Sequence, residues 1–413
     1  MNILYITFSD ILGQQFNGYL LQKELSKLGH RSDMAVHLCE ERDNQYIHQM
    51  GTWFTIRINK FLSLIEHILS LRCVLPSLAS TIYFQDYYKH ADVIHLQLVH
   101  GTKFFSLTNV PIITRQKPVF WTMHDPWLTT GHCVHSLGCE RWKTGCGNCP
   151  NLKINFPISI DTTHINWYYK KWVMDHVANL HLIVASQYMY NLIKESPITN
   201  QFPVSIIPFG VDLNIFKPRD SSLCRSKLGI PPDARVISFR SSPYASVKGT
   251  EYAEDALSKI NSRKPIWLIT FGAKNNMSIL RGKYPIVELG WTNDTELVAT
   301  ALSASDMFLM PSIAEAFGLM AIEAMACGVP VIAFEGTSLP EVIHAPEGGI
   351  VVPMKDSTAL ALAIEELLED ETKRQKIANN ALKIARQEYT VELYVKRHLD
   401  LYKTVLKSQL PLD

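Results

Sequence analysis

The sequence lacks several features that mark particular classes of protein. Its 40 lysine and arginine residues are balanced by 39 aspartate and glutamate residues, so the formal net charge is +1. Without a basic excess there is no electrostatic footprint for nucleic acid. No window approaches the roughly 20 apolar residues that are needed to cross a bilayer. We therefore expect a protein that neither binds nucleic acid nor spans a membrane.

The first residues also lack the marks of a secretion signal. The segment Met1–Phe8 has no basic leader, no long apolar core and no cleavage site. Its short apolar run is typical of a β-strand instead. We expect a cytoplasmic protein, with peripheral contact to the inner face of a membrane as an open alternative.

The length and the pattern of apolar runs indicate two α/β domains. A chain of 413 residues exceeds the size at which a single hydrophobic core stops growing. Short apolar runs alternate with amphipathic helical stretches, as in parallel-sheet domains. Pro and Gly interrupt this pattern near residues 205–215. We predict domains at 1–207 and 208–390. The expected strands are 3–8, 93–98, 119–123, 182–185, 236–239, 266–271, 307–310, 329–333 and 350–352, with a first helix from about 14 to 28.

Two carboxylates flank a predicted helix start in the segment Met310–Glu323. Glu315 lies before the start and Glu323 lies along the helix. The first helical turn offers unpaired N–H groups and a positive dipole to a diphosphate, here from Phe317, Gly318 and Leu319. The carboxylates can accept hydrogen bonds from pairs of sugar hydroxyls. An ordinary amphipathic helix with an acid near its start is the alternative, but the whole pattern favours a sugar-nucleotide site.

This segment resembles the E-x7-E signature of retaining glycosyltransferases of the large family-four group. The Pro311-Ser312 pair before it and the run 328–333 after it agree with that family. The resemblance implies the GT-B fold, in which two Rossmann-like parallel-sheet domains face a central cleft. It implies that Glu315 contacts the donor sugar and that Glu323 binds ribose hydroxyls. It also implies that the last helix, within 391–413, packs back onto the first domain.

Two cations follow the expected strand 236–239. Arg240 ends this strand and Lys248 precedes the next helix, so both lie at the carboxyl edge of a parallel sheet, where ligands of such sheets bind. There they can neutralise a diphosphate leaving group. They resemble the family's G-R and K-G pattern, although Phe239 replaces the glycine and the spacing is longer. A solvated arginine and a helix-start lysine are the alternative.

A histidine and a glycine in the first domain complete the resemblance. His124 follows the strand 119–123 in a T-x-H-D sequence similar to that around the family's active-site histidine, where it can bond the sugar or handle a proton. A structural histidine is the alternative. Gly13 matches the second glycine of the family's G-G loop, while Leu12 replaces the first. Base recognition is expected around Gly290-Trp291.

The resemblance implies retaining transfer of a hexose from a UDP- or GDP-sugar to a hydroxyl of a glycan or lipid-linked oligosaccharide. The setting it suggests is bacterial surface polysaccharide or O-antigen synthesis. No D-x-D triplet occurs, which argues for metal-independent chemistry. Arg240 and Lys248 would stabilise the departing charge while Glu315 and His124 orient the sugar. A nucleotide-sugar dehydrogenase or epimerase would need a G-x-G-x-x-G loop, which is absent. A non-catalytic nucleotide-sugar-binding protein stays open.

Half of the cysteines lie in one short segment. The chain has eight, and four of them form a loop with a C-x-x-C pair, namely Cys133, Cys139, Cys146 and Cys149. This spacing is typical of a zinc knuckle, so we predict a structural zinc ion that orders the loop beside His124. His132 or His135 could replace one ligand. Two disulfides, a redox pair and four free thiols are the alternatives.

The stretch from Trp53 to Arg72 is rich in apolar residues at helical spacing, with Arg57 and Lys60 among them. A helix that packs its apolar side on the first domain's sheet is the favoured interpretation. The alternative is a helix that lies on a membrane surface. In that case the acceptor would be lipid-linked.

Overall fold

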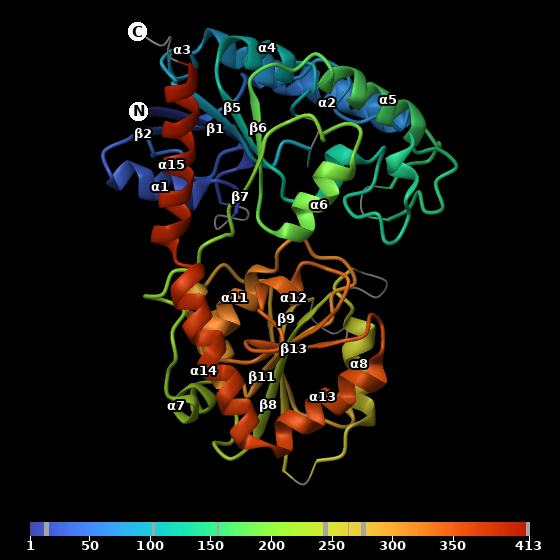
Figure 1. The fold of residues 1–413 in the computed structure, drawn as a ribbon, viewed down its shortest axis with the longest axis vertical. Coiled ribbons are helices and arrows are strands. Elements are labelled where there is room, and N and C mark those ends of the chain that lie inside the picture. Colours follow the sequence, from blue (N-terminus) through green and yellow to red (C-terminus); the bar gives the residue numbers. More distant parts are fainter. Residues whose placement is uncertain are drawn as a thin grey trace. The chain divides into compact units, whose positions relative to one another are not determined.

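The chain forms two compact units, each built on one parallel sheet. The computed structural model describes residues 1–11, 16–100, 104–154, 157–242, 247–262, 264–273 and 278–409. Unit 1 comprises Met1–Ile207 and Val395–Asp413, and unit 2 comprises Pro208–Tyr394. Helices surround the sheet in each unit (Figure 1). Each unit thus has the α/β architecture that the alternating apolar and amphipathic runs predict.

The sheet of unit 1 has seven strands in the order β3-β2-β1-β4-β5-β6-β7, all parallel. The central strands β4 and β5 are buried at every residue, as strands covered by helices on both faces must be. The strands are β1 Asn2–Ser9, β2 Arg31–Leu38, β3 Ile47–Gln49, β4 Val93–Leu96, β5 Val119–Thr122, β6 Leu180–Val184 and β7 Val204–Ile206. The helices are α1 Tyr19–Lys27, α2 Trp53–Ile68, α3 Asp86–Lys89, α4 Asn109–Gln116, α5 Thr163–Met174 and α6 Gln187–Glu195, with 3-10 turns at Leu78–Phe84, Pro126–Thr129 and Arg141–Lys143.

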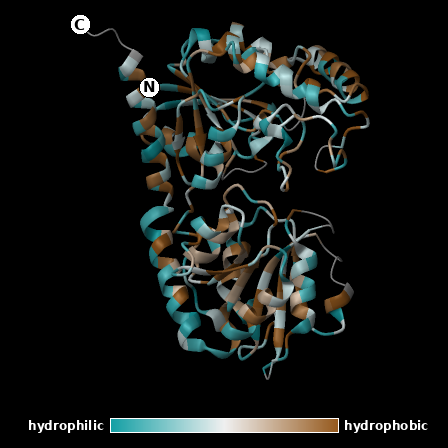
Figure 2. Ribbon diagram, turned by 45° about the vertical axis from the view of Figure 1, so that its right-hand side comes forward, coloured by the Kyte–Doolittle hydropathy of each residue, from teal (hydrophilic) through white to brown (hydrophobic). Residues whose placement is uncertain are grey.

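The sheet of unit 2 has six parallel strands in the order β10-β9-β8-β11-β12-β13. The strands are β8 Arg235–Ser241, β9 Ile266–Gly272, β10 Ile286–Gly290, β11 Met307–Met310, β12 Val331–Phe334 and β13 Gly349–Val352. The helices are α7 Ser221–Lys227, α8 Thr250–Lys259, α9 Ser278–Arg281, α10 Thr295–Ala304, α11 Leu319–Ala326, α12 Leu339–Val342, α13 Ser357–Glu369 and α14 Glu371–Glu388. Figure 2 shows hydrophobic residues on the strands and hydrophilic ones along α14. The last helix, α15 Val391–Gln409, starts in unit 2 and belongs to unit 1 from Val395 onward.

Every strand expected from the sequence overlaps an observed strand. The sequence did not predict β2, β3, β7 and β10, because β2 contains polar residues and the other three are short or partly exposed. The first helix begins at Tyr19, later than expected. The preceding Gly18 has a φ of 96°, outside the helical region, and the side chain of Asn17 accepts the N–H of Tyr19.

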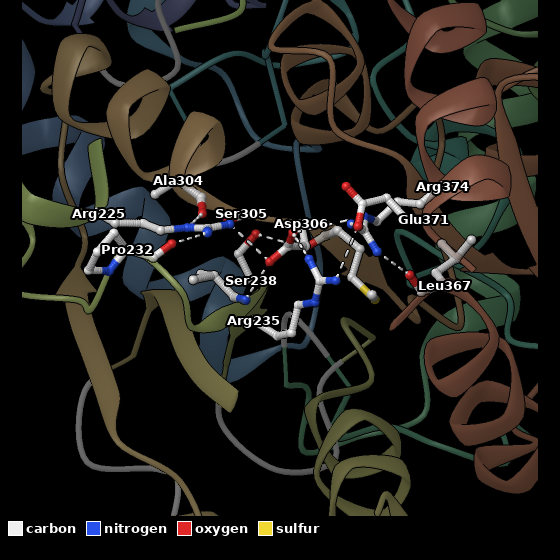
Figure 3. A network of polar contacts seen from close by, with 12 residues as sticks. Arg225, Pro232, Arg235, Ser238, Ala304, Ser305, Asp306, Leu367, Glu371 and Arg374 are labelled. Carbon is white, nitrogen blue, oxygen red and sulfur yellow. Dashed lines mark hydrogen bonds and ion pairs between the residues drawn. The ribbon is translucent and has the colours of Figure 1, made fainter. Parts of the chain in front are cut away.

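A buried ion network closes the amino end of unit 2's sheet (Figure 3). Asp306, just before β11, accepts hydrogen bonds from the guanidinium of Arg225 at 3.0 Å and from the N–H of Val236 at 2.7 Å. Arg235 and Arg374 pair with the other carboxylate oxygen at 3.4 and 3.8 Å. Because Val236 lies in β8, this carboxylate joins the starts of two neighbouring strands.

Candidate functional site

The strand order of unit 2 places two of the predicted motifs at one edge of the sheet. The sequential order reverses between β8 and β11, which are neighbours. The carboxyl ends of the strands at such a reversal are the usual ligand position in open parallel sheets. Lys248 lies in the loop after β8, and Glu315 lies in the loop after β11. The topology therefore explains why motifs far apart in the sequence meet.

These two loops contact each other directly. The N–H of Ile313 donates to the carbonyl oxygen of Val247 at 2.8 Å. Gly249, the N-cap of α8, has a φ of 68°, and a Cβ at this position would lie 1.9 Å from the carbonyl oxygen of Pro311. Only glycine tolerates both the left-handed backbone and this approach. The glycine after Lys248 thus has a packing role that holds the two loops together.

The predicted charged residues of unit 2 gather here. The ammonium of Lys248 donates to Oε2 of Glu315 at 2.7 Å, and both side chains are largely buried. Burial lowers the pKa of the Arg240 guanidinium, while the nearby carboxylates of Glu315 and Glu323 raise it. Arg240 therefore lies within electrostatic reach of both acids. Two cations and two carboxylates together form a site that can hold an anion and bind hydroxyls.

The predicted helix start is present and has no side-chain cap. The helix α11 begins at Leu319, after Gly318 with a φ of 100°. Because no side chain caps this start, its first N–H groups can serve an anionic ligand. Phe317 is buried just before the start, with its ring edge-on to Phe209 at 5.4 Å and to Tyr389 at 5.8 Å. These aromatic contacts fix the turn that carries the predicted N–H donors.

Ser338 is a positioning residue that sequence reasoning missed. It is fully buried between β12 and α12. Its hydroxyl lies 3.0 Å from the carbonyl oxygen of Glu315 and 3.2 Å from that of Phe317, and its N–H also donates to Glu315. These bonds hold the backbone at Glu315 and Phe317, just before the start of α11. No local pattern in the sequence could have indicated a serine so far downstream.

Trp291 follows β10 and exposes 75% of its surface. The guanidinium carbon of Arg240 lies 4.9 Å from the centre of its ring. Arginine favours the face of an aromatic ring electrostatically. A large exposed ring beside the charged cluster offers a platform for a flat, uncharged group, in the region where the sequence predicts base recognition.

In unit 1, His124 follows β5 and is largely enclosed. Its Nε2 lies 2.8 Å from Oε1 of Gln97. Burial lowers the pKa of His124 to about 3, against the opposing effect of Asp125, so the ring is neutral at physiological pH. With an amide oxygen as its partner, Nε2 carries the proton and Nδ1 is the nitrogen that can accept one. His124 is therefore arranged as a neutral group, suited to orienting a hydroxyl rather than to carrying charge.

A chain of polar contacts behind His124 was not foreseen from the sequence. The amide nitrogen of Gln97 lies 3.0 Å from Nε2 of His95, and Nδ1 of His95 lies 2.5 Å from the hydroxyl of Tyr402. Tyr402 belongs to α15, so the end of the chain supports the residues around His124. The predicted Gly13 lies outside the described residues.

The four clustered cysteines line one small pocket together with His132. No described group of three or more His, Cys, Asp or Glu side chains is arranged to hold a metal ion, and all eight cysteines are free thiols. In the absence of a metal ion, burial raises the pKa of Cys133 and Cys149, and raises that of Cys146 to about 11. The cysteines are thus not paired in disulfides, while a structural zinc ion at this pocket stays a prediction.

Contacts with the helix α5 also hold this loop. The fully buried Lys170 of α5 donates to the carbonyl oxygens of Trp127 at 2.6 Å and Thr130 at 2.7 Å. The indole N–H of Trp167 donates to the carbonyl oxygen of Trp142 at 2.8 Å. Burial lowers the pKa of Lys170 to about 7. Side chains of α5 thus help to hold the loop in place.

Comparison with known proteins shows what the site-bearing part of unit 2 is similar to. Residues 223–384 match the family model described as Glycosyl transferases group 1. The matched segment contains Arg240, Lys248, Glu315 and Glu323. A relative, the putative colanic acid biosynthesis glycosyl transferase WcaC of Escherichia coli, is 26% identical over 274 residues, which are 63% of this chain and 64% of the relative. The chain spans about half the length of other curated relatives that it matches.

Solved structures show the fold over nearly the whole chain. Sucrose-phosphate synthase from Thermosynechococcus elongatus is similar with a TM-score of 0.70 and 20% identity, covering 98% of this chain and 99% of that one. HepE of Anabaena in complex with UDP and glucose is similar with a TM-score of 0.65 and 18% identity, covering 98% and 100%. The fold is GT-B, as the sequence predicts.

Proposed function

We propose that this protein is a retaining glycosyltransferase that moves a sugar from a nucleotide-diphosphate donor to an acceptor hydroxyl. The observation that carries the proposal is the cluster of Arg240, Lys248, Glu315 and Glu323 beside the uncapped start of α11. The group 1 family match over the same residues supports it. Cations and helix N–H groups suit a diphosphate, and the carboxylates suit sugar and ribose hydroxyls.

The ion pair between Lys248 and Glu315 gives the site a way to respond to its donor. Without a ligand, the two side chains neutralise each other at 2.7 Å. A diphosphate would compete for the ammonium, because it carries more charge than one carboxylate. Glu315 would then accept hydrogen bonds from the sugar hydroxyls. Donor binding would thus prepare the carboxylate that orients the sugar.

The chemical step relies on stabilising the charge of the leaving group. As the bond between the sugar and the diphosphate breaks, negative charge builds on the phosphate oxygens beside Arg240 and Lys248. The acceptor hydroxyl attacks the same face of the sugar and gives its proton to the leaving diphosphate, so configuration is retained. No metal ion takes part in this scheme. His124, neutral and hydrogen-bonded to Gln97, orients a hydroxyl group.

For the substrates, we infer a UDP- or GDP-sugar and a hydroxyl of a glycan or lipid-linked oligosaccharide in bacterial surface polysaccharide or O-antigen synthesis. The similarity to WcaC, which is named for colanic acid biosynthesis, supports an acceptor of this class. HepE, which is similar in fold, is solved with UDP and glucose, so UDP-glucose is the first donor to test.

The test is a thermal-shift screen with UDP-, GDP-, dTDP- and ADP-sugars on the wild type, Lys248→Ala and Glu323→Ala. A donor at about 100 times its Kd stabilises the folded protein by about 2.7 kcal/mol. We expect one donor class to raise the Tm of the wild type and not that of either variant. The exposed Lys264→Ala and Glu369→Ala, which also each remove one charge from unit 2, should behave as the wild type.

Equal stabilisation of the wild type and the site variants would contradict the proposed donor site. The donor that binds is then incubated with acceptor glycans, and release of the free nucleotide is measured. Donor binding without transfer or hydrolysis would favour a non-catalytic nucleotide-sugar-binding protein instead.

A further inference from the structure

The helix α2 turns its apolar side away from the protein. Trp53, Phe54 and Phe61 are 68%, 64% and 62% exposed. At 100° per residue, the exposed apolar side chains share one broad face, made up of Trp53, Phe54, Ile58, Phe61, Leu64 and Ile68. We call these six residues the α2 apolar face. Contiguous exposed apolar patches are uncommon on monomeric proteins and mark contact surfaces.

The polar side of α2 is the one that faces the protein. The buried residues of this helix are Asn59 and Glu66. The carboxylate of Glu66 accepts the N–H groups of Val74 at 2.7 Å and Leu75 at 2.8 Å. These bonds fix the rotation of the helix about its axis. The expectation that α2 packs its apolar side on the sheet is therefore wrong, since the helix is anchored through its polar residues.

The charge on the exposed part of α2 is positive. The guanidinium of Arg57 lies over the ring of Trp53 at 3.8 Å, and Lys60 is exposed beside the apolar face. Glu66 is the single acid of this helix and is buried. An exposed helix face with aromatic and aliphatic side chains, cations and no acid is the pattern of helices that lie in the interface of anionic membranes.

The neighbouring helix α5 adds further exposed apolar side chains. Ser70, just after α2, accepts hydrogen bonds at its carbonyl oxygen from Thr162 at 2.5 Å and Asn166 at 3.2 Å, so the end of α2 is tied to the start of α5. Along α5, Tyr168 and Trp172 expose more than half of their surface. Tyrosine and tryptophan are the residues enriched at the level of lipid headgroups.

We propose that the α2 apolar face inserts into the surface of an anionic membrane, with Arg57 and Lys60 at the lipid phosphates. No described helix is long and apolar enough to cross a membrane, so the contact is peripheral. The positive charge of the exposed helix favours an anionic lipid surface over a second copy of this chain, because two copies of the face would bring like charges together.

Vesicle flotation tests this proposal with the full chain and without any donor or acceptor. The vesicles contain either phosphatidylcholine alone or equal parts of phosphatidylethanolamine and phosphatidylglycerol. We expect the wild type to float with the anionic vesicles and to bind the neutral ones at least about tenfold more weakly, since each cation near an anionic surface adds to binding. Because this assay does not measure sugar transfer, a failure to bind vesicles would not contradict the proposed transferase activity.

Two variants and a control separate the outcomes. Phe54→Gln/Phe61→Gln/Leu64→Gln should reduce binding to anionic vesicles at least about tenfold through lost apolar burial. Arg57→Gln/Lys60→Gln should reduce the same binding about tenfold but leave weak neutral binding unchanged. The matched control Leu223→Gln/Ile279→Gln/Leu362→Gln removes equally exposed apolar side chains from unit 2 and should float as the wild type does. All variants change exposed or partly exposed side chains, and their folding is checked by circular dichroism.

Equal flotation of the wild type and the apolar-face variant would overturn the proposal. So would a wild-type dimer, seen by size exclusion with light scattering, that the apolar-face substitutions convert to a monomer. That result would assign the α2 apolar face to contact between two copies of the chain.

Discussion

The two ends of unit 2's sheet use the same residue types for different purposes. At the amino end, Asp306 is surrounded by Arg225, Arg235 and Arg374 (Figure 3). At the carboxyl end, Arg240 and Lys248 lie near Glu315 and Glu323. Both clusters pair guanidinium and carboxylate groups next to β8 and β11. Composition alone therefore does not tell a structural ion network from a ligand site.

The difference lies in what the cations bind besides the carboxylates. At the amino end, Arg225 also donates to the carbonyl oxygens of Ala304 and Pro232, and Arg374 donates to that of Leu367. These backbone contacts tie the network to the fold. At the carboxyl end, the cations adjoin an uncapped helix start at the loops that follow β8 and β11. An anion can bind at the carboxyl end, where donors converge at the edge of the sheet. At the amino end, the arginines already bond Asp306 and backbone carbonyl oxygens, so the network offers an anion no binding place.

The largest effect is expected from breaking the amino-end network. Asp306→Ala leaves three buried or partly buried arginines without their shared carboxylate, which should lower the free energy of unfolding by about 3–5 kcal/mol. Urea denaturation followed by circular dichroism measures this change. A loss below about 1 kcal/mol would mean that the network is no more important than a surface ion pair.

The carboxyl end should respond in the opposite way. Lys248→Ala should lower the transfer rate by about 10²–10³-fold, as loss of one charge-stabilising group does in other active sites. Glu323→Ala should lower it through weaker donor binding. The free energy of unfolding should change much less than for Asp306→Ala. The measurements are nucleotide release at the same donor concentration for the wild type and the variants, and urea denaturation. A stability loss as large as that of Asp306→Ala would make this cluster structural too.

Gly249→Ala tests the contact between the two loops. The added Cβ would meet the carbonyl oxygen of Pro311 at 1.9 Å in a left-handed backbone, so the loops must move apart. We expect a stability loss of about 1–3 kcal/mol together with weaker donor binding. Gly282→Ala is the matched control, because no atom lies within 4 Å of a Cβ there. Similar donor affinity in both variants would show that the loop contact does not shape the site.

Trp291→Ala should have the smallest effect and should act on binding alone. Loss of a stacking platform for the nucleotide base should raise the KM for the donor about tenfold with little change in kcat. Trp291→Phe should restore most of the affinity. Trp172→Ala, which removes a ring that is 58% exposed from unit 1, serves as the control. An unchanged KM for Trp291→Ala would place the base elsewhere.

Local patterns predicted those parts of the protein that depend on residues close in sequence. The apolar runs located most strands, and the E-x7-E turn located the start of α11 within a few residues. The cysteine loop depends on distant contacts as well as on spacing. Spacing brings the thiols near one another, but three-dimensional contacts through Lys170 and Trp167 decide the positions of the loop. The positioning residues Ser338, Gln97 and Tyr402 had no local signal, because each acts across a distance in the chain.

The sequence by itself determined the two α/β domains, the acidic motif and the cations that follow a strand, since helix and strand periods and short motifs need no distant partner. Only the tertiary structure decided which motifs meet, because strand order sets which loops share an edge of the sheet. It also decided the rotation of α2. The apolar pattern is the same whichever way the helix faces, and the hydrogen bonds of Glu66 to Val74 and Leu75 turn that pattern outward.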